Sequence, residues 1–117
     1  MANFHTLYEY DSAVGSEDKP NNPLIYRTIE TGSYAPNAFG LYDMHGSVLE
    51  WSADRYGDYA TGSAIDPSGP TSGKYRVLRG GSWGNYGRGC RAAVRRIDDP
   101  VRRSLYFGFR VVLAPTR

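Results

Sequence analysis

This chain has a single cysteine, Cys90, among its 117 residues. One thiol forms no internal disulfide, and it builds neither a zinc cluster nor a Cys-x-x-Cys redox pair. Histidine is almost as scarce, since His5 and His45 are the only two. No nucleophile motif accompanies either of them, so a Ser/His/Asp triad is not expected. His45 is interpreted as a local hydrogen-bond partner in a turn.

The chain also lacks a long hydrophobic run. No stretch approaches the roughly 18 apolar residues that a helix needs to cross a bilayer. Residues 1–10 have neither a basic start nor an apolar stretch, so they do not form a secretory signal. We therefore expect no membrane contact and a cytoplasmic location, unless a signal has been removed.

At this length we expect one domain, residues 1–117, with a modest core. The net charge is only +2, but it is uneven: residues 67–117 hold eleven basic and two acidic side chains. A basic half can bind an anion or a nucleic acid. The alternative, which we favour, is that the arginines brace the scaffold against the acidic half, because they are spread through a patterned motif.

Strands and loops alternate along the chain without strong helical periodicity, except over residues 4–14. Residues 16–23 and 57–73 have turn chemistry and are predicted to be loops. A strand or one helical turn is predicted over 90–96. Alternation of apolar and polar residues predicts short strands at 48–51, at 74–83 with a glycine bend, and at 108–113, closed by Pro115. The fold class is therefore α+β, irregular, with short strands and long loops.

Two strand-like anchors, 79–83 and 108–112, bracket a segment of different character, residues 84–107. Fixed ends around a changeable middle are typical of a binding surface mounted on a scaffold. The Gly80-Gly81 pair is not a phosphate loop, because the Lys-Ser/Thr ending is missing. We predict that Trp51, Trp83 and Phe109 pack in the core rather than serve as ligand platforms.

Ordered motifs extend over residues 28–114: P-N-A-F-G-L-Y-D-M-H-G-S-V-L-E-W at 36–51, Y-R-V-L-R-G-G-S-W at 75–83, C-R-A-A at 90–93 and G-F-R-V-V at 108–112, with Arg95 and Pro100 between the last two. This series resembles the formylglycine-generating enzyme (sulfatase-modifying factor) family. The resemblance implies that family's C-type-lectin-like fold, with short twisted antiparallel strands, long ordered loops and often bound calcium.

The chain departs from the enzymes of that family in two respects. It is similar only to the C-terminal portion of the family domain. The catalytic members also bind copper through a cysteine pair just after the Gly-Gly-Ser motif, and the first of those positions falls at Asn85. Cys90 fits the family's Cys-Arg-x-Ala framework instead. A soft copper site needs the sulfur pair, so we expect neither copper nor oxidative catalysis.

The variable proteins of diversity-generating retroelements are similar to the same pattern. In that branch the diversified positions do not become Lys, Glu, Gln, Met or Trp, and residues 84–107 contain none of these five types. The resemblance implies scaffold roles for Arg91, Arg95, Pro100, Arg103 and Arg110. It implies diversified positions at Gly84, Asn85, Tyr86, Gly89, Val94, Arg96, Ile97, Asp98, Arg102, Ser104, Leu105 and Tyr106.

Tyrosine with arginine is the composition of adaptable binding surfaces. The first hypothesis is therefore a non-catalytic module that recognises a protein partner, or alternatively a glycan. Two other classes stay open: a truncated or partner-dependent oxidoreductase of the formylglycine-generating type, and an anion-binding or nucleic-acid-binding protein. The predicted ligand-binding residues are Asn85, Tyr86, Arg88, Val94, Arg96, Ile97, Asp98, Arg102, Ser104, Leu105 and Tyr106.

A possible calcium site follows from the family resemblance. In the family, calcium is bound by carbonyls at positions matching His45, Gly46 and Val48 and by the acid matching Glu50, and a hard cation prefers such oxygen ligands. The alternative is that Glu50 pairs with a scaffold arginine. Asp98-Asp99-Pro100 is predicted to begin a turn rather than to provide a pair of metal ligands.

Overall fold

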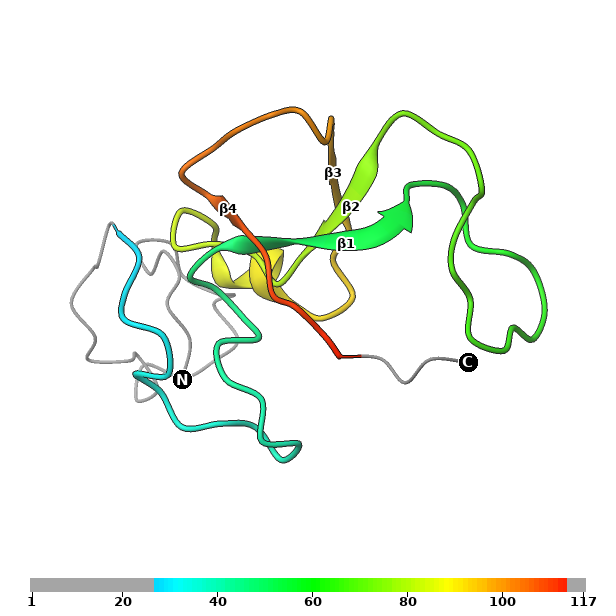
Figure 1. Cartoon of the computed structure of the whole chain (residues 1–117). Helices are drawn as coiled ribbons and strands as arrows, with labels where there is room; N and C mark the ends of the chain where they lie inside the picture. Colours follow the sequence, from blue (N-terminus) through cyan, green and yellow to red (C-terminus); the bar gives the residue numbers. More distant parts are fainter. Residues whose placement is uncertain (1–26, 114–117) are drawn as a thin grey trace.

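The computed structural model of this chain describes residues 27–113. Figure 1 shows four short strands and one turn of 3-10 helix, joined by long irregular connections. The strands predicted at 48–51 and 74–83 are present, with somewhat different bounds. The predicted stretch 90–96 lies between the end of the 3-10 turn and the start of a strand. The elements are β1 (Leu49–Arg55), β2 (Arg76–Arg79), η1 (Gly87–Cys90), β3 (Arg96–Asp98) and β4 (Phe107–Gly108).

The strands form one sheet in the order β3-β2-β1-β4. β2 pairs antiparallel with β1, where Trp51 lies opposite Leu78, and also with β3. β4 pairs parallel with β1, where Leu49 lies opposite Phe107, so the expectation of purely antiparallel strands is wrong at this edge. The physical reason is the connection 99–106, which leads from β3 to the opposite edge (Figure 1). Parallel pairing requires such a crossover.

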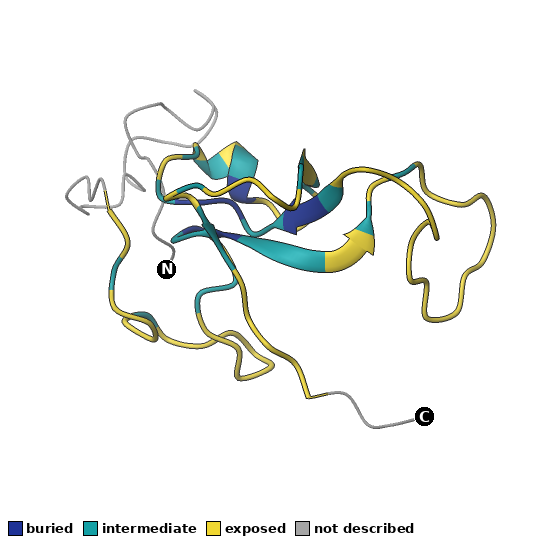
Figure 2. Cartoon of the chain, turned by 45° about the horizontal axis from the view of Figure 1, so that its top comes forward, coloured by how far each residue is buried: buried dark blue, intermediate teal, exposed yellow. Residues whose placement is uncertain are grey.

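The core lies along β2 and the start of β1. Val77 and Leu78 are only 2% and 1% exposed, and Leu49, Cys90 and Ser82 are also buried. In Figure 2 the buried residues appear in dark blue at the centre of the molecule, and most of the loops around them are exposed. Burying a side chain such as Leu78 stabilises the fold by about 1.5–3 kcal/mol. This small core therefore supports the chain just where it enters the segment 84–107.

The predicted strand at 108–113 is not formed beyond Gly108. β1 pairs with β4 only through Leu49 and Glu50, and residues 109–113 continue without a strand partner among the described residues. Phe109 is 75% exposed, so its prediction as a core residue is wrong. Trp51 and Trp83 are half-buried and pack against aromatic rings, Trp51 edge-on against Phe107 at a centroid distance of 5.4 Å.

Some expectations fall outside residues 27–113. These are the helical periodicity of residues 4–14, most of the interpretation of the N-terminal region, including the loop 16–23, and the closing role of Pro115. Within the described part, no helix has the length and apolar character that crossing a bilayer requires. The cytoplasmic location stays a prediction.

The glycine bend after β2 is confirmed. Gly80 and Gly81 have φ values of +86° and +72°, in the left-handed region that glycine adopts without strain. A Cβ on Gly81 would lie 2.5 Å from Sγ and 2.8 Å from Cα of Cys90. Glycine is thus required at position 81 for two reasons: the backbone conformation and the close approach of Cys90.

We expect Gly81→Ala to destabilise the fold more than Gly40→Ala does. Gly40 has a similar φ, +75°, but no atom within 4 Å of its would-be Cβ. Gly40→Ala therefore reports the left-handed backbone alone, about 1–2 kcal/mol. Gly81→Ala adds overlap with the Cys90 backbone, about 1–3 kcal/mol more. Urea unfolding measures both, and equal losses would contradict the tight packing at Cys90.

Candidate ligand-binding site

The entrance to the segment 84–107 is fixed by hydrogen bonds around Ser82. The backbone amide and the hydroxyl of Ser82 both donate to the side-chain oxygen Oδ1 of Asn85, each at 3.0 Å. The backbone amide of Asn85 in turn donates to the Ser82 carbonyl at 2.9 Å. The Trp83 amide donates to the Ser47 carbonyl at 3.0 Å. The Asn85 oxygen therefore has a structural role, although the sequence predicts Asn85 as a ligand-binding residue.

Two arginines, Arg79 in β2 and Arg95 in the segment itself, hold the segment in place by binding backbone carbonyls. Arg79 donates to the carbonyls of Ala92 and Val94, both at 3.1 Å. Arg95 donates to the Gly57 carbonyl at 2.8 Å, and its guanidinium lies 4.3 Å from the centroid of the Tyr59 ring. These bonds agree with the predicted bracing, but the acceptors are backbone carbonyls rather than acidic side chains.

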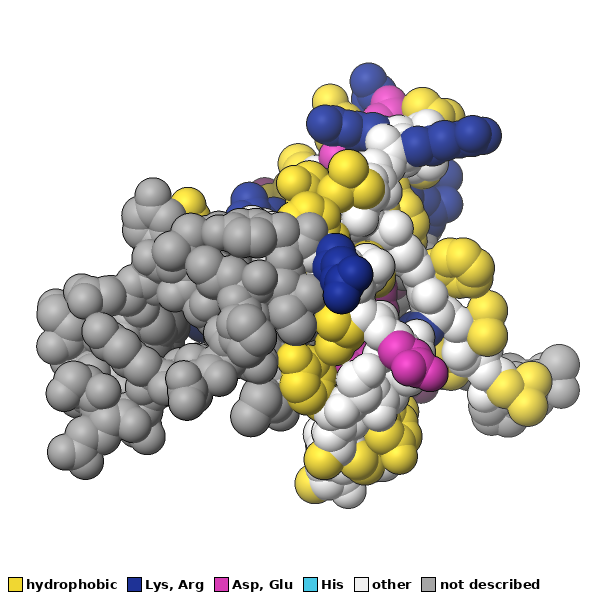
Figure 3. Space-filling view, turned by 90° about the vertical axis from the view of Figure 1, so that its left-hand side faces the viewer, with side chains coloured by type: hydrophobic (Ala, Val, Ile, Leu, Met, Phe, Trp, Pro, Cys, Tyr) yellow, Lys and Arg dark blue, Asp and Glu magenta, His cyan; other side chains and the backbone are white. Residues whose placement is uncertain are grey.

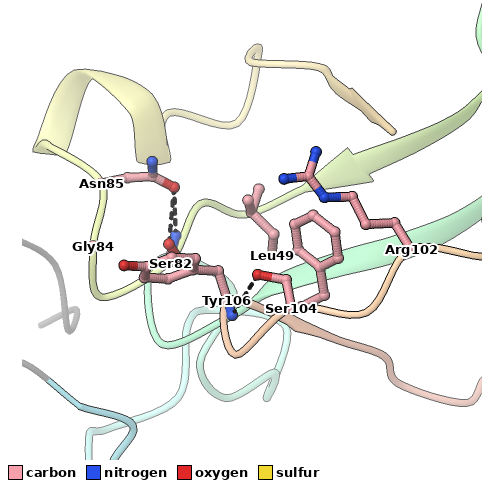
Figure 4. A pocket seen from close by; sticks show the side chains of 8 residues that line it. Leu49, Ser82, Gly84, Asn85, Arg102, Ser104 and Tyr106 are labelled. Atoms are coloured by element: carbon pink, nitrogen blue, oxygen red, sulfur yellow. Dashed lines mark hydrogen bonds between the residues drawn. The ribbon is translucent and has the colours of Figure 1, made fainter. Parts of the chain in front are cut away.

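The two ends of the segment meet in one pocket of about 300 Å³ (Figure 4). Leu49 and Ser82 line it from the scaffold and Phe107 from the last position of the segment, and sequence reasoning did not single out any of the three as site residues. Ser82 belongs to the Gly-Gly-Ser motif and Phe107 directly precedes Gly-Phe-Arg, which was the available signal for these two residues. The other residues of the segment that line the pocket are Gly84, Asn85, Arg102, Ser104 and Tyr106.

The other predicted ligand-binding residues do not line this pocket. Arg96, Ile97 and Asp98 form β3 at the far edge of the sheet. Asp98 links the two groups, because its carboxylate pairs with Arg102 at 3.2 Å. The remaining four belong to neither group: Arg88 lies in η1 and the other three lie on connections. Val94 is half-buried and the others are exposed: Tyr86, Arg88 and Leu105. The structure thus places some predicted residues at the pocket, some at the sheet edge and four at neither.

A turn begins at Asp99, directly after β3 ends at Asp98, as predicted for the segment Asp98-Asp99-Pro100. The Asp99 carbonyl accepts the Arg102 amide at 2.9 Å, and its side chain accepts the Val101 amide at 3.2 Å. The Asp99 carboxylate also pairs with Lys74 at 3.3 Å. Within residues 27–113, no group of three or more His, Cys, Asp or Glu side chains is arranged to hold a metal ion.

Glu50 pairs with a scaffold arginine, which was the alternative to calcium binding. Both of its carboxylate oxygens accept hydrogen bonds from Arg110, each at 2.5 Å. Arg110 also donates to the carbonyls of Tyr42 and Asp43, at 3.0 and 3.2 Å. The hydrogen bond to Glu50 raises the pKa of the Arg110 guanidinium. Arg110 thereby ties the end of β4 to β1 and to the loop 42–43.

The other three predicted calcium ligands lie in the loop before β1. Gly46 is buried and its amide donates to the Gly80 carbonyl at 2.8 Å. Nδ1 of His45 lies 2.7 Å from the Cys90 carbonyl. His45 is therefore a hydrogen-bond partner, as predicted, but its partner is 45 residues away in the sequence and not in its own turn. The side chain of Val48 lies beside Gly108. A cation at Glu50 would have to share its carboxylate with Arg110.

Cys90 is buried at the end of η1. Its thiol lies 3.9 Å from the Ser82 carbonyl, and burial raises the pKa of the Cys90 thiol. A neutral, enclosed thiol is a poor nucleophile, because the thiolate is the reactive form. Cys90 therefore acts in packing, against Gly81 and Ser82.

Residues 9–115 match the family of the sulfatase-modifying factor enzyme 1-like domain, and the chain belongs to this family. The serine/threonine-protein kinase pkn1 of Chlamydia pneumoniae is 46% identical over 87 residues, which are 71% of this chain and 14% of the kinase. The formylglycine-generating enzyme of Thermomonospora curvata is 35% identical over 96 residues, which are 75% of this chain and 32% of the enzyme. The chain thus spans a third or less of these relatives.

Two solved structures are similar to the fold. Treponema denticola variable protein 1 has a TM-score of 0.67 and 41% identity, over 72% of this chain and 31% of that protein. PvdO from Pseudomonas aeruginosa has a TM-score of 0.65 and 30% identity, over 93% of this chain and 38% of that protein. The resemblance to the enzyme family and the similarity to a variable protein are both confirmed.

We expect Cys90 to react slowly with Ellman's reagent in the native protein and rapidly after unfolding in urea. The reaction of the native protein should rise at higher pH than that of the unfolded chain, because burial raises the pKa of the Cys90 thiol. Because the pKa of the Cys90 thiol is raised in the folded protein, the stability that the buried neutral thiol contributes is fully present at neutral pH. It is lost as pH rises through the raised pKa. Equal native and unfolded rates would contradict the burial of Cys90. The variant Cys90→Ser has no thiol and serves as the control for background reaction of the reagent.

Proposed function

We propose that this chain is a non-catalytic ligand-binding module, similar in role to the variable proteins of diversity-generating retroelements. The observation that carries the proposal is that both ends of the segment 84–107 line one pocket, next to the buried residues Leu49 and Ser82. A loop with fixed ends and exposed side chains is how a scaffold presents a binding surface. The similarity to Treponema denticola variable protein 1 supports this role.

The C-type-lectin-like fold is part of the same proposal. A short curled sheet, a single 3-10 turn and long connections among residues 27–113 are compatible with it. A lectin-type fold does not imply that sugar is the ligand, because function depends on the site.

A protein partner fits the exposed side chains better than a glycan does. Leu105 is 66% exposed, and Tyr86, Ile97 and Tyr106 are also exposed, beside several arginines. Tyrosine and arginine are enriched among the few residues that carry most of the binding energy of protein interfaces. On the face shown in Figure 3, basic side chains gather at the upper end, while hydrophobic ones lie along the middle and the lower end.

An oxidoreductase of the formylglycine-generating type is the second candidate, because relatives with that name are among the matched proteins. It requires a second thiol from elsewhere, since Cys90 is the only cysteine of this sequence. The burial and the raised pKa of Cys90 also argue against it. Binding of an anion or a nucleic acid through the basic half is the third candidate. Several of its arginines already bind carbonyls or carboxylates.

We expect the triple variant Tyr86→Ala, Arg96→Ala, Tyr106→Ala to lose affinity for a protein partner by about 100-fold or more, because central Tyr and Arg residues each contribute about 2 kcal/mol or more. The measurement is a calorimetric titration with the partner purified from the cell of origin. The control replaces three exposed side chains outside the segment with Ala: Phe39, Ile65 and Val112. Unchanged affinity of the folded triple variant would show that the assigned face is wrong.

We also propose that calcium binds at the loop 45–48 through the carbonyls of His45, Gly46 and Val48, with the Glu50 carboxylate. Several oxygens near a carboxylate suit calcium. The Glu50–Arg110 pair opposes it, so we expect weak binding.

Millimolar calcium should raise the melting temperature of the protein by a few degrees, since a ligand that binds only the folded state stabilises it. Glu50→Gln should abolish this increase. The control is magnesium at the same concentration. An unchanged melting temperature with calcium would exclude the site.

A further inference from the structure

The Tyr106 ring is held in one position by the scaffold. Its centroid lies 4.8 Å from that of Trp83, with the rings tilted by 43°. The Tyr106 carbonyl accepts the Leu49 amide at 2.7 Å, and its amide donates to the Ser104 hydroxyl at 3.2 Å. Both its backbone and its ring are therefore anchored, the ring on a residue just outside the segment 84–107.

Gly84 provides the space that this ring occupies. A Cβ at position 84 would lie 2.6 Å from Cε1, 3.2 Å from Cδ1 and 3.3 Å from Cζ of Tyr106. Gly84 does not have a left-handed φ, so its backbone would accept any residue. The need for glycine here comes from the Tyr106 ring, not from the backbone.

Both residues line the same pocket (Figure 4). Leu49 lines it from the scaffold, and Arg102 lies on the opposite side of it from Tyr106. A change in the ring's position changes the shape of the pocket directly, because the ring forms one of its walls.

We propose that positions 84 and 106 form one specificity-determining pair in the binding surface, a step that rests on the proposed function. The side chain at 84 decides whether an aromatic ring at 106 stays against Trp83. Glycine at 84 with tyrosine at 106 gives a pre-formed aromatic wall, and this order lowers the entropy cost of binding. A larger residue at 84 displaces the ring and gives a pocket of another shape. The two positions, 22 residues apart in number, are therefore not independent.

A double-mutant cycle on the ligand-free chain tests this coupling. With Tyr106 present, Gly84→Ala should lower the folding equilibrium constant about tenfold or more, because the added Cβ overlaps the ring and overpacking destabilises the fold. In the Tyr106→Ala background, Gly84→Ala should leave that constant unchanged or raise it up to about fivefold, as alanine for glycine does where φ is compatible. The same effect in both backgrounds would overturn the proposal. If Gly84→Ala alone prevents folding, recovery of the fold in the double variant supports it.

The matched control is Gly89→Ala. Its Cβ would lie 3.4 Å from Cβ of Asn85, an ordinary contact, and its φ is not left-handed. Its effect on folding should not depend on the residue at 106.

Quenching of Trp83 fluorescence by acrylamide reports the ring directly, in a Trp51→Phe background that leaves Trp83 as the only tryptophan. Gly84→Ala should increase the quenching and Gly89→Ala should not. Unchanged quenching in Gly84→Ala would mean that the ring has not moved, which contradicts the proposal. These measurements need no ligand, so their failure is distinct from failure of the partner-binding test.

Discussion

The close approach of Gly81 to Cys90 is the constraint on which the position of the segment 84–107 depends. The chain leaves the buried strand β2, turns at two glycines with left-handed φ, and lies directly against the residue at which η1 ends. The same contact buries the thiol and places the Cys90 carbonyl beside His45. The start of the segment 84–107 is thus fixed by backbone packing, which allows its exposed side chains to differ without loss of the fold.

The bracing of the segment follows the same physical rule. Arg79 binds the carbonyls of Ala92 and Val94, and Arg95 binds the Gly57 carbonyl. Every residue type has a carbonyl oxygen, so these bonds do not depend on which side chain stands at 92 or 94. A segment that is held by its backbone leaves its outward-facing side chains available for the binding role proposed above. Positions 84, 85 and 95 are exceptions: a Cβ at 84 would overlap the Tyr106 ring, and the side chains of Asn85 and Arg95 make hydrogen bonds that hold the segment.

Membership of the sulfatase-modifying factor family and the chemistry of the site lead to different expectations for activity. Family members include enzymes that are named for formylglycine generation, but this chain spans only 14% of the kinase and 32% of the formylglycine-generating enzyme described above, and it has one cysteine. That cysteine is buried and neutral, and it packs against the glycine bend. In this chain the position contributes to the shape of the scaffold, which is compatible with a binding role.

The sequence by itself determined the family, the glycine bend and the turn at Asp99, because these depend on local backbone chemistry and on ordered motifs. It predicted that arginines brace the scaffold against acidic side chains, but Arg79 and Arg95 bind backbone carbonyls of residues distant in the sequence. Only the tertiary structure decided which residues meet. The crossover 99–106 makes β4 parallel to β1 and brings the two ends of the segment together at one pocket, whereas β3 lies at the opposite edge. It also leaves Phe109 exposed, since a strand is buried only where another segment covers it, and alternation along one strand does not show whether such a segment exists.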